Sequence, residues 1–204
     1  MALCLGCVLV LPTIVLVQAV FECFLKSGAI MSYDASNEIR EMSVEDKVKL
    51  IDVIYSARPG NLFSERTKQF ILGGCALPSS KMELAVSEKA FQKLNKLKSR
   101  WVVNGKVFLF SSDRPKGFVI EHMIPVKVLH NHLKKYYLAR GGLSREDLNN
   151  FVKKYCKVVL ITEEEDKSLR EAKLTSKMPK DCDFTKDPTA RYKECGITLH
   201  KSSK

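Results

Sequence analysis

Two segments decide the fold: Phe118-Val-Ile-Glu-His-Met-Ile-Pro-Val126 and, further along the chain, Val158-Val-Leu-Ile-Thr-Glu-Glu-Glu-Asp166. The first is typical of a strand that ends in an acid–histidine pair, and Pro125 follows where a helix begins. The second is typical of an apolar strand that runs directly into a helix with an acidic first turn, which suits the helix dipole. If the two strands pair, Glu121 and His122 lie close to the start of that helix.

Capping signals, turn residues and apolar periodicity predict the other elements. We expect helices over about 44–57, 64–72, 88–103, 126–139, 144–155 and 188–195, and further strands over 106–110 and 157–162. Gly73-Gly74 is expected to end the second of these helices, and Gly196 the last. The predicted fold class is α+β, a mainly helical domain with a small antiparallel sheet that forms a ββα finger. The predicted division is an apolar segment over 1–30, a helical subdomain over 31–104, and the ββα region with its C-terminal helix over 105–204.

The acid–histidine pair has a chemical logic. A hard divalent cation needs oxygen ligands, and Glu121 together with Glu165 or Asp166 supplies them. His122 would then activate a water molecule against a phosphodiester, while the metal stabilises the charge that develops on the phosphate. The expected cofactor is a divalent metal ion, with Mg²⁺ as the first choice and Mn²⁺ or Zn²⁺ as alternatives.

This region resembles the HNH, or His-Me finger, nucleases, whose first strand typically ends in Asp-His, Glu-His or His-His and is followed shortly by Pro. Here the matching residues are Glu121-His122-Met-Ile-Pro125, and the resemblance covers about residues 106–172. It implies a metal-dependent endonuclease in which His122 is the general base and Glu121 binds the metal.

Two departures from the family pattern leave an alternative open. No His or Asn follows on the helix after the second strand, so Glu165 or Asp166 has to replace it as a ligand. No Cys-x-x-Cys pair braces the finger. The alternative interpretation is structural: a common strand end, followed by carboxylates that only favour a helix N-terminus.

The charge predicts a polyanionic partner. The chain carries a net charge of +11, and phosphate backbones are the commonest target of such a surface. We expect nucleic acid, with DNA favoured over RNA. The candidate contacts are Arg114, Lys116, Lys173, Lys177 and Arg191, and a second candidate surface is the lysine-rich face of the helix expected over 88–103. The rival functions are a non-catalytic basic protein that binds nucleic acid, and a membrane-tethered basic interaction protein.

The N-terminus and the cysteines bear on location. Ala2–Leu25 is almost continuously apolar and long enough to span a bilayer. It is interpreted as a membrane anchor, as a signal peptide (weakened because no Lys or Arg precedes it), or as upstream translated sequence with Met31 as the initiator. The seven cysteines form no matched Cys-x-x-Cys pairs, which indicates free thiols in a reducing compartment. The expected location is cytoplasmic, with an inner-membrane anchor and a cytoplasmic basic domain as the alternative.

Overall fold

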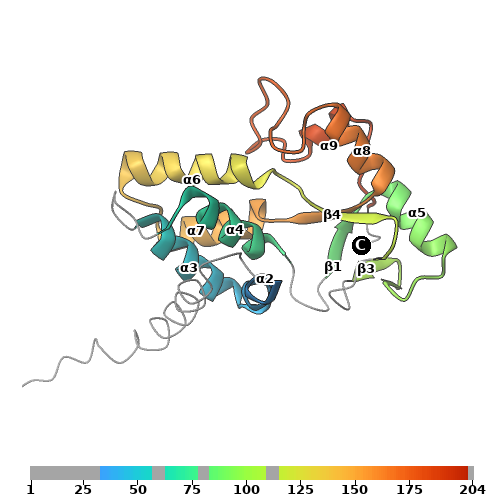
Figure 1. The fold of residues 1–204 in the computed structure, drawn as a ribbon, viewed down its shortest axis with the longest axis horizontal. Helices are drawn as coiled ribbons and strands as arrows, with labels where there is room; N and C mark the ends of the chain where they lie inside the picture. The colour runs from blue at the N-terminus through green and yellow to red at the C-terminus, as the bar shows by residue number, and fades with distance from the viewer. Residues whose placement is uncertain (1–32, 57–62, 78–82, 109–114, 202–204) are drawn as a thin grey trace, which may run out of the picture.

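The computed structural model describes residues 33–56, 63–77, 83–108 and 115–201, and it has an α+β fold (Figure 1). The helices of this part are α2 (Tyr33–Glu41), α3 (Val44–Ser56), α4 (Glu65–Ala76), α5 (Glu88–Lys96), α6 (Val126–Arg140), α7 (Arg145–Tyr155), α8 (Glu163–Glu171) and α9 (Ala190–Glu194). The strands are β1 (Glu83–Val86), β2 (Val102–Val103), β3 (Lys106–Phe108), β4 (Phe118–His122) and β5 (Val158–Thr162). The predicted fold class is confirmed at this level.

The sheet is mixed, and here the prediction of an antiparallel sheet was wrong. Its strands lie in the order β2-β3-β1-β5-β4. The pairing of β4 with β5 is antiparallel, as expected, but β1 runs parallel to β5. A parallel neighbour requires a long crossover, and the chain between β1 and β5 supplies it. The strand β1 was not predicted, because a strand of four residues is too short to give a clear alternating pattern.

The strand β5 lies at the centre of the molecule. All five of its residues are buried, and successive side chains point to opposite faces of the sheet. Val158 and Leu160 belong to the main core, which the helical layer of α2, α3, α4, α6 and α7 also lines. Val159 and Ile161 belong to a second, smaller cluster beneath α8 and α9. The sequence of β5 is almost continuously apolar because both faces of the sheet are covered here.

Two helices differ from their predicted bounds. Helix α4 continues through Gly73 and Gly74 to Ala76 instead of ending at the glycine pair. Gly74 is there for packing, since a Cβ atom at this position would lie 3.0 Å from Cγ2 of Ile39 on α2. Helix α5 is shorter than expected, because it ends at Lys96 and the chain then turns into the β2–β3 hairpin.

Several expectations concern the chain's division and its N-terminus. The boundary predicted near residue 104 falls at the turn of the β2–β3 hairpin, where Asn104 and Gly105 both have positive φ angles. The main core includes residues from both sides of it, from Ile39 to Phe184. Ala2–Leu25 lies outside the described residues, and within the described ranges no helix has the length and apolarity to cross a membrane.

Candidate functional site

The pairing of β4 with β5 separates the two halves of the predicted metal site. In the antiparallel register, Phe118 lies opposite Thr162 and His122 lies opposite Val158. Four residue steps therefore separate His122 from the level of Thr162, which is about 13 Å along the strand. Thr162 is the N-cap of α8, so the acidic first turn begins at the far end of the ladder. His122 was expected to lie close to Glu165 and Asp166, but this register places them at opposite ends of the β4–β5 pair.

Glu165 is a capping residue. Its side chain is buried, and the carboxylate oxygen Oε2 accepts hydrogen bonds from Ser87 Oγ at 2.6 Å, from the Thr162 backbone N–H at 2.8 Å and from Thr162 Oγ1 at 3.1 Å. Ser87 is the N-cap of α5, and Thr162 is the N-cap of α8. The carboxylate thus joins two helix N-termini, which favour a negative charge. For Glu165 the structure therefore agrees with the alternative interpretation, in which the carboxylate only favours a helix N-terminus.

The other two proposed ligands also have partners. Glu121 Oε1 accepts from Arg191 Nη2 at 2.7 Å, and Asp166 Oδ2 lies 3.1 Å from Arg170 Nη2. Within the described part of the chain, no three His, Cys, Asp or Glu side chains converge as a metal ion would require. The residues proposed from the sequence therefore do not fit one cation in this arrangement.

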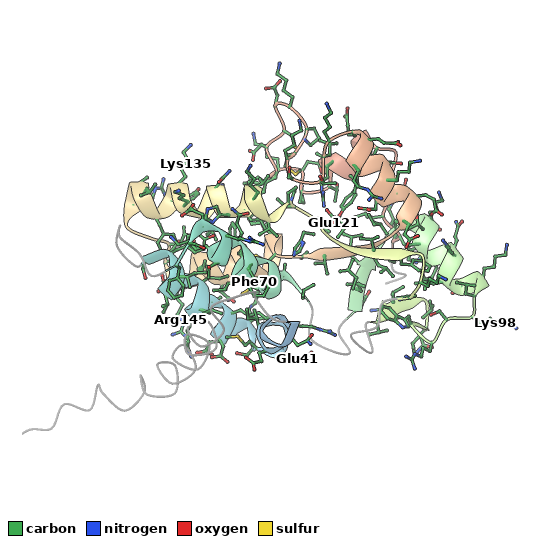
Figure 2. The ribbon with its side chains drawn as sticks, viewed as in Figure 1. Glu41, Phe70, Lys98, Glu121, Lys135 and Arg145 are labelled. Atoms are coloured by element: carbon green, nitrogen blue, oxygen red, sulfur yellow. The ribbon has the colours of Figure 1, made fainter. Side chains whose placement is uncertain are left out.

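Arg191 is buried, so the predicted phosphate contact is corrected. Its side chain has no exposed surface. The guanidinium donates to the backbone carbonyls of Met123 and Leu174 at 3.1 and 2.9 Å, to the carbonyl of His122, and to Glu121. This arginine holds the chain where it leaves β4, and Figure 2 shows Glu121 on this part of β4, below the C-terminal helices.

His122 has the geometry of a neutral base with a fixed tautomer. Its Nε2 lies 3.2 Å from the carbonyl oxygen of Gly73 on α4. A carbonyl only accepts, so the proton is on Nε2 and the lone pair is on Nδ1. Burial lowers the pKa of His122 below its usual value, which keeps the ring neutral at pH 7. The residue is only partly buried, and Nδ1 has no hydrogen-bond partner among the described residues.

The remaining predicted phosphate contacts lie at the surface. Lys116, Lys173 and Lys177 are exposed and form no ion pair with a described residue. Lys177 lines an open cavity of about 650 Å³ together with Lys180. Arg114 lies outside the described residues.

A row of aromatic rings with a cation at each end was not predicted from the sequence. The guanidinium of Arg140 lies 5.4 Å from the Tyr136 ring, which contacts His132 on the same helix. The edge of Phe184 meets both His132 and Tyr155, at centroid distances of 5.0 and 5.4 Å. Lys154 Nζ lies 5.0 Å from the Tyr155 ring and closes the row. Only the fold brings these rings of α6, α7 and the C-terminal segment together.

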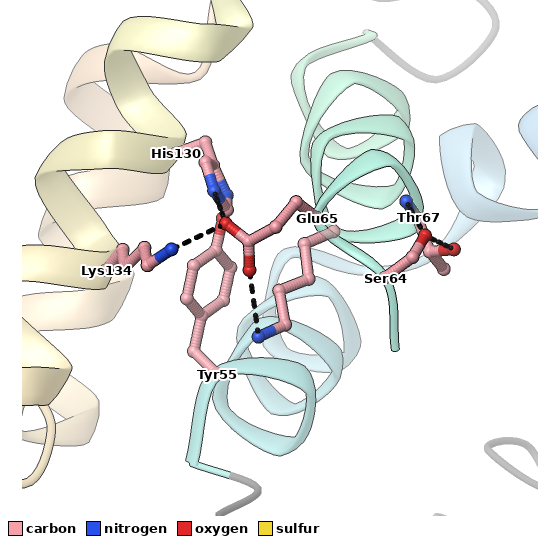
Figure 3. A network of polar contacts seen from close by, with 7 residues as sticks. Tyr55, Ser64, Glu65, Thr67, His130 and Lys134 are labelled. Atoms are coloured by element: carbon pink, nitrogen blue, oxygen red, sulfur yellow. Dashed lines mark hydrogen bonds and ion pairs between the residues drawn. The ribbon is translucent and has the colours of Figure 1, made fainter. Parts of the chain in front are cut away.

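A second unpredicted network joins α3, α4 and α6 (Figure 3). The ring of His130 is bound on both sides, by the hydroxyl of Tyr55 at Nδ1 and by the carboxylate of Glu65 at Nε2, each at 2.8 Å. Lys134 donates to the same carboxylate oxygen at 2.9 Å. Both nitrogens of this buried imidazole are occupied, so His130 stabilises the helical layer and is not a free base.

Comparisons with protein-family models, with curated proteins and with solved structures give no match for this chain. The functional argument therefore rests on the geometry described above.

Proposed function

We propose that this protein binds nucleic acid through the surface of α6 and α7 that carries Tyr136, His132 and Tyr155 with the flanking cations Lys135, Arg140 and Lys154. The row of rings between these cations is the observation that carries the proposal. Cations attract the phosphate backbone without regard to sequence. The rings beside them are partly exposed, and stacking of a base on an aromatic side chain contributes about 1–3 kcal/mol. We call this region the α6–α7 surface.

The charge pattern supports the choice of this surface. The segment from His122 to Arg145 contains five Lys or Arg residues and no Asp or Glu. Among the described residues, Lys135, Arg140 and Lys154 form no ion pair, whereas Lys134 is bound to Glu65. Cations without carboxylate partners stay available to phosphates. Figure 2 shows Lys135 pointing outward from α6.

A matched pair of variants tests the surface. Helix α5 and the residues after it offer three exposed cations that also lack ion pairs: Lys89, Lys96 and Lys98. We expect Lys135→Ala/Arg140→Ala/Lys154→Ala to lower the affinity for a labelled oligonucleotide and to reduce the slope of log K against log salt by about 2–3, since each phosphate contact contributes about 0.7–0.9. The Lys89→Ala/Lys96→Ala/Lys98→Ala variant removes the same charge and should leave the slope nearly unchanged. Equal losses in both variants would refute the assignment of the surface, and no binding by the parent protein would refute the function.

Hydrolysis of phosphodiester bonds is the second candidate, and the tautomer of His122 favours it. Nδ1 is the free nitrogen of a neutral imidazole, and it would take a proton from water as the water oxygen bonds to phosphorus and the P–O bond of the leaving oxygen breaks. His122 lies just before α6, and its ring contacts Gly73 on α4. The first turn of α6 carries no carboxylate, and its positive end suits a phosphate.

No step of this candidate mechanism runs through a metal ion. Glu121, Glu165 and Asp166 are each engaged elsewhere, as described above, so this chain's own contribution is the base at His122 and the surrounding cations. A plasmid nicking assay measures a metal requirement directly, by comparing the nicking rate in Mg²⁺ with the rate in a chelator.

A plasmid nicking assay tests the candidate. His122→Gln keeps a side-chain N–H to donate to the Gly73 carbonyl but has no basic nitrogen. We expect it to abolish nicking of supercoiled plasmid and to keep oligonucleotide affinity within about twofold. Because the pKa of His122 is lowered, nicking by the parent protein should persist below pH 6.5 and fall only where the ring becomes protonated. Nicking by His122→Gln at the parent rate would refute the role of His122.

A further inference from the structure

Arg191 is the most extensively bonded side chain near His122, whereas the sequence predicted only a phosphate contact for it. Its guanidinium is fully buried in the junction between the end of β4, the loop after α8, and α9. Besides the hydroxyl of the adjacent Tyr192 at 3.4 Å, it contacts four acceptors that come from two separate segments. Three are backbone carbonyls, of His122, Met123 and Leu174, and the fourth is the carboxylate of Glu121.

The two backbone contacts at the end of β4 explain why a buried arginine is needed here. The strand β4 lies at the edge of the sheet and ends at His122, so the carbonyls of His122 and Met123 need donors from outside the sheet. A buried carbonyl without a hydrogen-bond donor is unfavourable in free energy. The planar guanidinium has several N–H groups and can donate to several carbonyls at once. Tyr192 adds a hydroxyl that donates to the His122 carbonyl at 3.3 Å.

The geometry points to Arg191 as the residue that positions His122 for its reaction, with Glu121 as the counter-ion of Arg191. The assignment rests on the hydrolysis proposed for His122. The imidazole is held at two places: its ring by the Gly73 carbonyl on α4, and its backbone by Arg191 on α9. Without the contact from Arg191, the ring can move away from the Gly73 carbonyl. The imidazole is then no longer held in the single tautomer that leaves Nδ1 unprotonated.

Glu121 takes a different role from the one predicted by the family resemblance. A buried guanidinium requires a nearby negative charge, and Glu121 is the carboxylate within ion-pair distance of it in the described structure. One oxygen of this carboxylate is bound to Arg191 at 2.7 Å. The acid beside the histidine therefore balances the positioning arginine.

The experiment uses Arg191→Lys, with Arg170→Lys as the matched control at an exposed arginine that pairs with Asp166. Lysine keeps the positive charge but lacks the planar fork, so it satisfies fewer of the four acceptors. Nitrogen-15 chemical shifts of the histidine ring report which nitrogen carries the proton. We expect a single Nε2–H form of His122 in the parent protein and in Arg170→Lys, and an averaged mixture of both tautomers in Arg191→Lys. Nicking at saturating plasmid should fall at least about tenfold in Arg191→Lys, with oligonucleotide affinity unchanged.

The outcomes separate this inference from the proposal beneath it. An unchanged tautomer together with an unchanged nicking rate in Arg191→Lys overturns the positioning role. A parent protein that does not nick DNA refutes hydrolysis, and the tautomer measurement still decides what Arg191 does. If Arg191→Lys does not fold, Glu121→Gln decides the assignment of the carboxylate. Its amide oxygen still accepts from Arg191 but carries no negative charge, so we expect a lower unfolding midpoint, a mixture of both His122 tautomers and slower nicking. Unchanged stability, tautomer and nicking rate in Glu121→Gln would overturn both the counter-ion role of Glu121 and the positioning role of Arg191.

Discussion

The carboxylate of Glu165 offers the sharpest test of whether the acidic turn of α8 is structural. We expect Glu165→Ala to destabilise the fold without any effect on metal affinity. The substitution leaves three donors without their acceptor: the Ser87 hydroxyl, the Thr162 backbone N–H and the Thr162 hydroxyl. Two of these residues are N-caps of different helices, so the damage reaches α5 as well as α8.

The expected magnitude follows from these contacts. A net hydrogen bond to a charged acceptor contributes about 1.5–3 kcal/mol, but here all three donors share one oxygen and their contributions are not additive. Thr162 also keeps its own capping bond to the Glu165 backbone N–H in the variant. We therefore expect a loss of about 3 kcal/mol in the free energy of unfolding. For a domain of this size that loss lowers Tm by about 6–12 °C.

The assay is chemical unfolding followed by the emission of Trp101, the single tryptophan of the chain, which is buried in the main core. The matched control is Glu164→Ala, one residue away in the same acidic turn. Glu164 is exposed and lies 3.8 Å from the partly exposed Lys93, so its loss should change the stability far less than the loss of Glu165. A Glu165→Ala variant as stable as Glu164→Ala would refute the capping role. Loss of Mg²⁺ binding at unchanged stability would restore the metal-ligand interpretation.

Three further predictions concern the helical layer. Lys134 and His130 hold the pKa of Glu65 down to about 2, so Glu65 stabilises the fold above pH 5 and this contribution disappears as the pH falls from about 5 to 2. The difference in unfolding midpoint between the parent protein and Glu65→Gln should therefore shrink over that range, and a difference that does not change with pH would contradict the ion pair. Gly73→Ala should be neutral or stabilising by up to about 1 kcal/mol, because its Cβ meets only ordinary contacts at 3.5 Å within a helix. Gly74→Ala should instead cost about 1–3 kcal/mol in the same unfolding titration, because its Cβ would press on Ile39 at 3.0 Å, and equal stability of the two alanine variants would contradict the packing of α2 on α4.

The elements that the sequence predicts well are those whose signals are local. The helix bounds of α3, α6 and α7 and the start of α8 follow from capping residues and apolar periodicity, and the apolar run of β5 follows from burial on both faces. The pair Gly73-Gly74 shows the limit of such signals. Glycine that ends a helix and glycine that admits a neighbouring helix look the same in a sequence, and only the position of Ile39 distinguishes them.

The arrangement of the candidate site could not be predicted from local sequence signals, because strand register and burial determine it. The antiparallel pairing of β4 with β5 was anticipated, but in such a pair the end of β4 lies beside the start of β5 and not beside the helix that follows β5. The antiparallel register puts His122 and the first turn of α8 at opposite ends of β5. A prediction that two paired strands bring their functional ends together needs the register as well as the pairing.

The case of Arg191 shows why a charged residue near a proposed site is ambiguous until its solvent exposure is known. In the sequence it is one cation among the 34 Lys and Arg residues, and the net charge of +11 makes a phosphate contact the natural interpretation. The structure buries its whole side chain and surrounds it with acceptors from β4 and from the loop after α8. A buried guanidinium cannot meet a polyanion, but it can fix the backbone on which a catalytic side chain depends. The same arginine that was expected at the nucleic-acid surface is therefore more informative about His122 than about binding.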